Sequence, residues 1–227
     1  MSEDNYQNYH KAYWDGLSEL EGFRSVLDPN DRFGTKNLGI HELHQKQLDS
    51  VFKKLDFKKN RLVLDFGCGI GRNTAFLLKY FDEYIGVDQS CKMLEKAKDN
   101  FPTQRFVLSS DDQQIMNIKV DLFFSFWVFQ HIIQDEDLIK TLNYAYSILK
   151  SKGFLIFCER SALSRREEGM NEDYIVHRDP KEYISMVKGV GFRKVMIRKL
   201  NYRKSSLIGR IRKINRTGEN IYVFQKA

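Results

Sequence analysis

A glycine-rich turn directly after a short apolar run is the feature that most constrains how this chain folds. Residues 63–72 read VLDFGCGIGR, and glycine occupies every second position from Gly67 to Gly71. Glycine adopts positive φ values and brings the backbone into contact with a ligand, which any Cβ would prevent. The segment therefore predicts a buried strand, a tight turn and then a helix, with a nucleotide-like ligand at the turn.

An acidic residue follows the next apolar run at the distance typical of nucleotide-binding sheets. Asp88 comes about twenty residues after the turn, where a carboxylate can accept hydrogen bonds from both hydroxyls of a ribose. A dinucleotide fingerprint requires G-x-G-x-x-G, whereas this chain has G-x-G-x-G followed by Arg72. The missing third glycine counts against a nicotinamide dehydrogenase.

Apolar periodicity predicts alternating strands and helices along the rest of the chain. Strands are expected at 61–66, 84–87, 105–108, 120–126, 154–157, 192–200 and 221–224. Helices are expected at 41–55, 73–81, from Cys91 with Ser90 as N-cap, at 138–149 and at 180–189, with a short helix before residue 20. This order predicts an α/β fold, a Rossmann-like doubly wound seven-stranded sheet that is mostly parallel with an antiparallel last strand.

The length of 227 residues and the 42% hydrophobic content suit one domain over residues 1–227. Within it we expect an N-terminal helical cap (1–60), a polar loop acting as a substrate lid (159–179) and a basic insertion (203–219). The three cysteines have no paired spacing, which predicts a reducing compartment and neither disulfides nor structural zinc. Because we find no secretory signal or membrane-spanning segment, we expect a cytoplasmic protein.

The positive charge is concentrated near the C-terminus. Residues 188–227 carry twelve Lys or Arg and one Glu, a net +11, so residues 1–187 sum to 7 − 11 = −4. A helix over 203–216 would be apolar on one side and cationic on the other, which suits an anionic membrane surface or nucleic acid. The alternative is that its isoleucines pack on the sheet and its charges are solvated.

The combination of D-x-G-x-G-x-G, Asp88 and the order of elements resembles the class I S-adenosylmethionine-dependent methyltransferases over residues 61 to about 200. The resemblance implies that the turn passes under the methionine part of S-adenosylmethionine, that Arg72 pairs with its carboxylate and that Asp88 holds the ribose. It also implies that residues after the fourth strand face the reacting methyl group. The implied cofactor residues are Asp65, Gly67, Cys68, Gly69, Gly71, Arg72, Asp88, Gln89, Met93, Asp111, Asp112, Phe126 and Trp127.

His131 is the candidate catalytic base, since a hydroxyl acceptor must lose a proton and histidine titrates in the useful range. The alternative is that His131 caps or packs the following helix. Cys68 is interpreted as a small residue that fills the turn, and His41 and His44 as a solvated helix face without a third metal ligand. The candidate substrate residues are Tyr13, Trp14, Glu159, Arg160, Tyr174, His177, Arg178 and Tyr183.

We expect methyl transfer to an anionic small molecule or glycan, at oxygen and without a metal. A narrower likeness is to the protein N-terminal methyltransferases, through Tyr13 to Gly16, Gly69 to Arg72, Trp127 to His131 and Arg178-Asp179. That family has Asp-Asn after the fifth strand where this chain has Glu159-Arg160, and its basic substrates would be repelled by a +11 segment near the site. A further alternative is a non-catalytic module that binds nucleic acid through the basic segment.

Overall fold

The computed structural model describes residues 3–55, 57, 61–111, 115, 117–162, 164–170, 173–200 and 218–227. Seven strands are hydrogen-bonded in the order β3-β2-β1-β4-β5-β9-β8. Strands β1, β2 and β3 pair in parallel, as do β4 and β5, whereas β9 is antiparallel to both β5 and β8. The predicted seven-stranded Rossmann-like sheet with an antiparallel last strand is confirmed.

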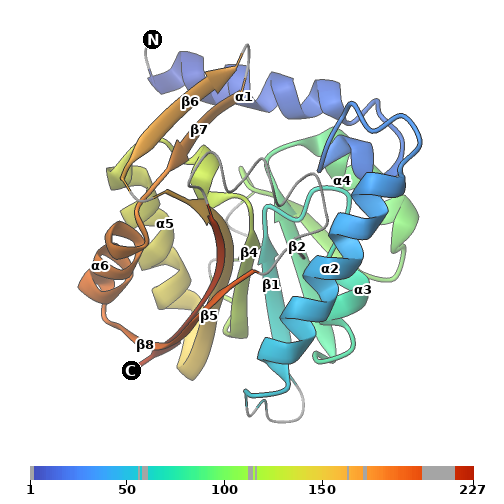
Figure 1. Ribbon diagram of the computed structural model, residues 1–227. Coiled ribbons are helices and arrows are strands. Elements are labelled where there is room, and N and C mark those ends of the chain that lie inside the picture. The colour runs from blue at the N-terminus through green and yellow to red at the C-terminus, as the bar shows by residue number, and fades with distance from the viewer. Residues whose placement is uncertain are drawn as a thin grey trace. The chain divides into compact units, whose positions relative to one another are not determined.

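The chain divides into two compact units, and Figure 1 labels many of their helices and strands. The first, residues 1–118 with 171–173, contains α1 (Glu3–Leu17), η1 (Gly22–Ser25), α2 (Thr35–Phe52), β1 (Leu62–Phe66), α3 (Thr74–Leu77), β2 (Glu83–Asp88), α4 (Cys91–Asn100) and β3 (Arg105–Leu108). The second, residues 119–170 with 174–227, contains β4 (Val120–Phe126), η3 (Phe129–His131), α5 (Asp135–Ile148), β5 (Leu149–Ser161), β6 (Arg166–Met170), β7 (Asp173–His177), α6 (Pro180–Val190), β8 (Phe192–Lys199) and β9 (Gly218–Lys226).

Helix α2 of the first unit begins six residues earlier than its apolar pattern predicted. Gly34, with φ 69°, precedes its first residue, and the buried Asn37 side chain joins it to the preceding loop. The Asn37 amide donates to the carbonyl oxygen of Asp28, 2.9 Å away, and the Asn37 backbone N–H donates to Asp31 Oδ2, 2.7 Å away. These polar contacts start the helix within a stretch that reads as a loop, since Asn and Asp favour such local bonds.

The N-terminus of α4 agrees with the prediction made from its cap. The Ser90 side chain accepts a hydrogen bond from the backbone N–H of Met93, 3.1 Å away. This bond satisfies one of the amides that a helix leaves without an intrahelical partner. Ser90 therefore ends the β2 loop and starts α4 at Cys91.

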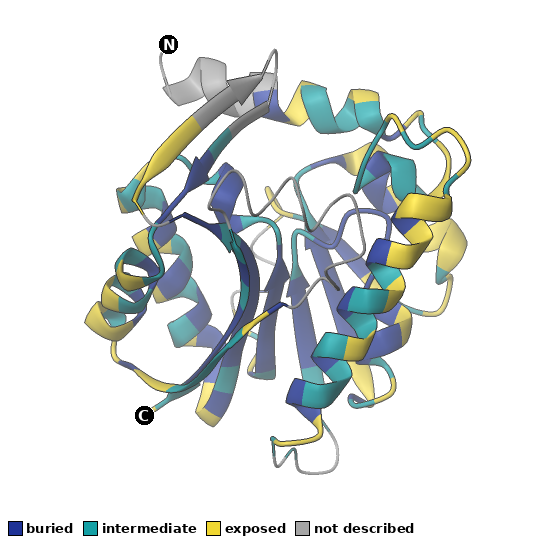
Figure 2. Ribbon diagram, in the orientation of Figure 1, coloured by how far each residue is buried: buried dark blue, intermediate teal, exposed yellow. Residues whose placement is uncertain are grey.

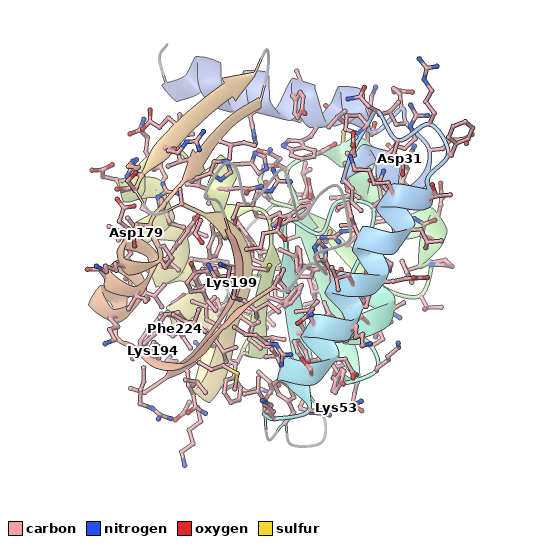
Figure 3. The ribbon with its side chains drawn as sticks, viewed as in Figure 1. Asp31, Lys53, Asp179, Lys194, Lys199 and Phe224 are labelled. Carbon is pink, nitrogen blue, oxygen red and sulfur yellow. The ribbon has the colours of Figure 1, made fainter. Side chains whose placement is uncertain are left out.

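Aromatic packing forms much of the core of the second unit, in which most residues of β4, β5 and β9 are buried (Figure 2). The rings of Phe157 on β5 and Tyr222 on β9 stack with centroids 4.6 Å apart. Asp179 caps α6, accepting from the backbone N–H of Lys181, while Glu182 returns a bond to the Asp179 backbone N–H (Figure 3). Pro180 occupies the first turn of α6, as predicted.

The expectation of a continuous loop over 159–179 is wrong. Strand β5 continues to Ser161, and β6 and β7 form a two-stranded sheet (Figure 1). Strand β6 was not predicted because it contains the charged residues Arg166, Glu167 and Glu168, and a strand is recognised in a sequence mainly by alternating apolar residues. Whether this hairpin acts as a lid over a substrate stays a prediction.

The expected basic insertion at 203–219 lies mostly outside the described residues, which resume at Gly218. The same holds for the segment 203–216 that was predicted to contact a membrane surface or nucleic acid. Among the described residues, no helix is both long and apolar enough to cross a membrane.

Candidate functional site

The turn after β1 adopts the positive-φ backbone that its glycines predicted. Gly67, Gly69 and Gly71 have φ values of 73°, 54° and 79°, a region that L-residues rarely adopt. A Cβ on Gly71 would also lie 3.0 Å from the Phe101 ring, and one on Gly69 would lie 3.0 Å from Val26. Both the backbone conformation and the neighbouring side chains therefore require glycine here.

Asp88 at the end of β2 is held against this turn. Its Oδ2 accepts from the backbone N–H of Gly69, 2.8 Å away, and its Oδ1 accepts from that of Ser90, 3.0 Å away. Burial raises the pKa of Asp88 above its usual value, while these backbone donors favour the charged form. A carboxylate has about four acceptor positions, so these two bonds leave capacity for the hydroxyls of a ribose. The carboxylate and the glycine turn thus fit the predicted cofactor.

Asp65 and Arg72, on either side of the turn, differ in their surroundings. Asp65 is 1% exposed, and its Oδ2 accepts from the hydroxyl of Tyr84, 3.0 Å away. Burial raises the pKa of Asp65 to about 7, against the hydrogen bond from Tyr84 and the charge of Arg72. Arg72 is half-buried, and its Nη1 lies 3.3 Å from His44 Nδ1. The expectation that His41 and His44 form a solvated face is wrong, because His44 is fully buried.

The structure gives packing roles to two other predicted cofactor residues. Cys68 is buried, and a Cβ on Gly86 would lie 2.8 Å from its Sγ, so the thiol fills space above that glycine. Burial raises the pKa of the Cys68 thiol, which keeps it neutral. Met93 is 1% exposed on α4. The small-residue interpretation of Cys68 agrees with this packing.

The remaining predicted cofactor residues of the first unit lie in loops. Gln89 Nε2 is 3.0 Å from the Nδ1 atom of His10 on α1. Asp111 is exposed, and its backbone N–H donates to the carbonyl oxygen of Leu108, 2.9 Å away. Asp112 lies outside the described residues.

Helix α1 is attached to the loop between Asp88 and α4 by side chains that the sequence patterns did not single out. Asp15 accepts a hydrogen bond from the Ser90 hydroxyl, and His10 contacts Gln89. The half-buried rings of Tyr13 and Trp14 pack edge to face, 5.3 Å apart. His10 and Asp15 make these contacts because α1 lies next to this loop in the folded protein. That proximity cannot be read from a single sequence.

In the second unit, the turn after β4 is strained without the use of glycine. Trp127 has a φ of 61° although it is not glycine, and its backbone N–H donates to the carbonyl oxygen of Cys158, 2.9 Å away. The Arg160 guanidinium carbon lies 4.7 Å from the centre of a Trp127 ring, within the range of a cation–π contact. Phe126 lies next to the same indole, with ring centroids 5.8 Å apart. Such strain persists only where neighbouring groups impose it.

Glu159 holds the residues that follow Trp127. Its fully buried carboxylate accepts from three consecutive backbone N–H groups, those of Val128, Phe129 and Gln130, at 3.0, 2.8 and 3.1 Å. Burial raises the pKa of Glu159 to about 8, although the three donors and the charge of Arg178 favour the ionised form. The carboxylate caps η3.

Arg178 holds the same segment from its carbonyl side. Its guanidinium, fully buried, donates to the carbonyl oxygens of Phe129, Ile132 and Ile133 at 3.1, 2.7 and 3.2 Å. It also pairs with Asp135 at 2.9 Å. Glu159 and Arg178 therefore hold the backbone from 128 to 133 between a buried carboxyl group and a buried guanidinium.

His131, the predicted base, ends η3 and is 8% exposed, with its Nε2 3.3 Å from the Nε2 of Gln130. His177 and Tyr183 are buried, and the Tyr183 ring centre lies 5.8 Å from the guanidinium carbon of Arg178. The side chain of Tyr174 lies outside the described residues. Asp135 escaped the sequence analysis, since its partner Arg178 is 43 residues away.

Among the residues that the structure describes, no group of three or more His, Cys, Asp or Glu side chains could hold a metal ion.

Residues 64–157 match a family model described as a methyltransferase domain. Phosphoethanolamine N-methyltransferase 1 of Zea mays is 25% identical over 185 residues, covering 78% of this chain and 35% of that protein. Trans-aconitate 2-methyltransferase of Rhodopseudomonas palustris is 33% identical over 97 residues, covering 42% of this chain and 37% of that enzyme. The chain thus spans little more than a third of these relatives' length.

A solved S-adenosylmethionine-dependent methyltransferase from Leishmania major has the same fold. It superposes with a TM-score of 0.76 at 20% identity, covering 96% of this chain and 82% of that one. The domain match includes β1, the glycine turn, Asp88 and β4, the elements on which the cofactor prediction was based. Residues 64–157 thus match a methyltransferase domain, and the chain has the fold of the class I S-adenosylmethionine-dependent methyltransferases, whose cofactor is S-adenosylmethionine.

Proposed function

We propose that this protein transfers a methyl group from S-adenosylmethionine to oxygen of an anionic small molecule or glycan. The observation that carries the proposal is the Asp88 carboxylate, held beside the positive-φ glycine turn by the N–H groups of Gly69 and Ser90. When bound, the cofactor would supply a sulfonium methyl group, which the acceptor would take by in-line attack at carbon, with S-adenosylhomocysteine as the leaving group. The protein mainly has to align the acceptor and exclude water.

Cofactor binding is assigned to residues of the first unit, each by its own chemistry. Asp88 accepts from the ribose hydroxyls and Arg72 binds the carboxylate. Gln89, Met93 and either Asp111 or Asp112 contact the adenine. Phe126 and Trp127 stay predicted cofactor residues on the strength of the resemblance alone.

His131 is the proposed base that removes the proton from the acceptor hydroxyl. Its support is its position at the end of η3, a segment whose backbone is held by Glu159 and Arg178. A base held in one place needs little reorganisation when the acceptor binds. An amine acceptor that arrives deprotonated would not require this base.

We assign recognition of the acceptor's anionic group to Arg160. This side chain is about one third exposed, and its guanidinium lies over the Trp127 ring and 3.6 Å from Glu219. By contrast, the polar atoms of Glu159 and Arg178 are engaged by the protein's own backbone, which favours a positioning role for both. Two relatives are named for anionic acceptors, phosphoethanolamine and trans-aconitate, in keeping with this assignment.

We infer a single domain over residues 1–227, with a cap over 1–60 and a lid over 159–179. Tyr13, Trp14, Tyr174, His177 and Tyr183 stay candidate substrate residues. Cys68, Cys91 and Cys158 are all free thiols, which supports a cytoplasmic location.

The test is to incubate the protein with methyl-labelled S-adenosylmethionine and fractionated host extract. Label in a small-molecule or glycan fraction is expected, and Asp88→Ala should abolish both transfer and calorimetric binding of the cofactor. Glu83→Ala, an exposed acid at the other end of β2, is the matched control and should behave as wild type. His131→Ala should lower turnover while leaving cofactor affinity unchanged.

Other results of these labelling and binding experiments would favour one of the alternative functions. Label at protein N-termini would indicate a protein N-terminal methyltransferase. Salt-sensitive binding of nucleic acid without any transfer would indicate a binding module that uses residues 203–216. Unchanged cofactor binding by Asp88→Ala would contradict the cofactor assignment itself.

A further inference from the structure

A cluster of polar side chains on helix α2 contacts the residues that follow the glycine turn. The Nδ1 atom of His44, fully buried, lies 3.3 Å from Nη1 of Arg72, and Gln45 Nε2 donates to Oδ1 of Asn73, 3.1 Å away. His41 lies one helical turn before His44, on the same face of α2. Two imidazoles of the first unit therefore lie close to the guanidinium that is proposed to bind the cofactor carboxylate.

The contact between Arg72 and His44 determines where the proton of His44 lies. A guanidinium has only N–H donors, so Arg72 donates and His44 Nδ1 must accept with its lone pair. The proton of neutral His44 is then on Nε2. His44 thus orients the guanidinium without adding a positive charge to the cluster.

The Nδ1 atom of His41 is available for a hydrogen bond. It is buried and has no hydrogen-bond partner among the residues that the structure describes, and the His41 ring packs on Phe23 with centroids 4.4 Å apart. Burial, and then the charge of Arg72, lower the pKa of His41 to about 4, so the imidazole is neutral near pH 7. A buried polar atom without a partner is costly in free energy, and a bound ligand atom would relieve that cost.

We propose that His41 donates a hydrogen bond from Nδ1–H to the carboxylate of the cofactor's amino-acid part, alongside Arg72 as oriented by His44. The inference rests on the proposed function, because it deepens the assignment of the same binding site. A carboxylate suits the cluster, since its two oxygens accept both from a guanidinium and from a neighbouring imidazole N–H. A neutral donor completes this receptor without placing a second cation beside Arg72.

Calorimetry near pH 7.5 with two ligands tests the assignment. S-adenosylhomocysteine carries the carboxylate, whereas 5′-methylthioadenosine lacks the whole amino-acid part. His41→Phe keeps a ring against Phe23 but removes the donor, so it should weaken S-adenosylhomocysteine binding about tenfold and leave methylthioadenosine binding unchanged. His41→Asn places an amide nitrogen near the Nδ1 position and should restore most of the affinity.

A measurement on the wild-type protein does not depend on how the variants fold. In the protein with ¹⁵N-labelled histidine, the Nδ1–H of His41 should become protected from exchange with S-adenosylhomocysteine and not with methylthioadenosine. Equal loss of both ligands in His41→Phe, or no protection of this proton, would overturn the inference. Failure of the wild type to bind S-adenosylhomocysteine at all would instead overturn the proposed function.

Discussion

The turn after β1 and the turn after β4 both leave a parallel strand with positive φ angles, and they achieve this differently. The first uses Gly67, Gly69 and Gly71, for which such angles carry little steric cost. The second places Trp127 at a φ of 61° and holds the following residues with the side chains of Glu159 and Arg178. One turn is specified by its own residues, and the other by side chains 29 to 49 residues further along the chain.

The two turns also differ in what stabilises them. The glycine turn needs only the absence of Cβ atoms, so each substitution there should act locally. The Trp127 turn depends on the fully buried side chains of Glu159 and Arg178, whose removal leaves several backbone groups without partners in a dry environment. We therefore expect the second turn to be the more sensitive to distant substitutions.

The largest expected effect of a substitution is that of Arg178→Met. The variant keeps most of the side-chain volume but leaves three carbonyl oxygens and Asp135 without the guanidinium. Breaking a buried ion pair by removing one partner costs about 3–5 kcal/mol in the free energy of unfolding. Urea denaturation monitored by circular dichroism measures this change.

Arg165→Met is the matched control because Arg165 also pairs with Asp135, at 2.7 Å, but has a side chain that is 33% exposed. A pair with such exposure contributes less than about 1 kcal/mol. Similar losses in the two variants would show that the Trp127 turn does not depend on buried charge.

The second prediction concerns the pH dependence of the free energy of unfolding. The pKa values of Asp65 and Glu159 are raised to about 7 and about 8, whereas in an unfolded chain both titrate near 4. Between pH 4 and these raised pKa values, the carboxyl groups of Asp65 and Glu159 are protonated in the folded protein and ionised in the unfolded chain. The stability from both groups is therefore complete below about pH 4 and is lost as the pH rises through 7 and then 8, a decline of about 4–5 kcal/mol per group.

Urea titrations from pH 5 to 9 measure this decline. Glu159→Gln should flatten the portion that ends near pH 8, and Asp65→Asn the portion that ends near pH 7. A wild-type stability that rises across this range would contradict both assignments.

The smallest effect is expected for glycine substitutions in the first unit. Gly71→Ala forces an alanine to a φ of 79°, at about 1–2 kcal/mol, and brings its Cβ to 3.0 Å from Phe101. Gly39→Ala, in the exposed middle of α2 with no atom within 4 Å of the new Cβ, should stabilise by about 0.5–1 kcal/mol. Thermal unfolding of the two variants should give shifts of opposite sign, and a neutral Gly71→Ala would show that the turn tolerates a side chain.

The sequence correctly predicted those elements that are specified by residues close together in the chain. The bounds of β3 and β4 are as expected, and Ser90 and Pro180 mark the starts of α4 and α6. Sequence reasoning missed the start of α2 and the β6–β7 hairpin, because polar contacts form the first and charged residues fill the second.

The sequence by itself determined the alternation of strands and helices, the glycine turn, the position of Asp88 and thereby the cofactor. Only the tertiary structure decided that His44 lies against Arg72 and that Glu159 and Arg178 hold the segment containing His131. The physical reason is the range of the interactions. Backbone propensity and apolar periodicity act between neighbours in the chain, whereas a buried charge takes its role from partners that folding brings to it.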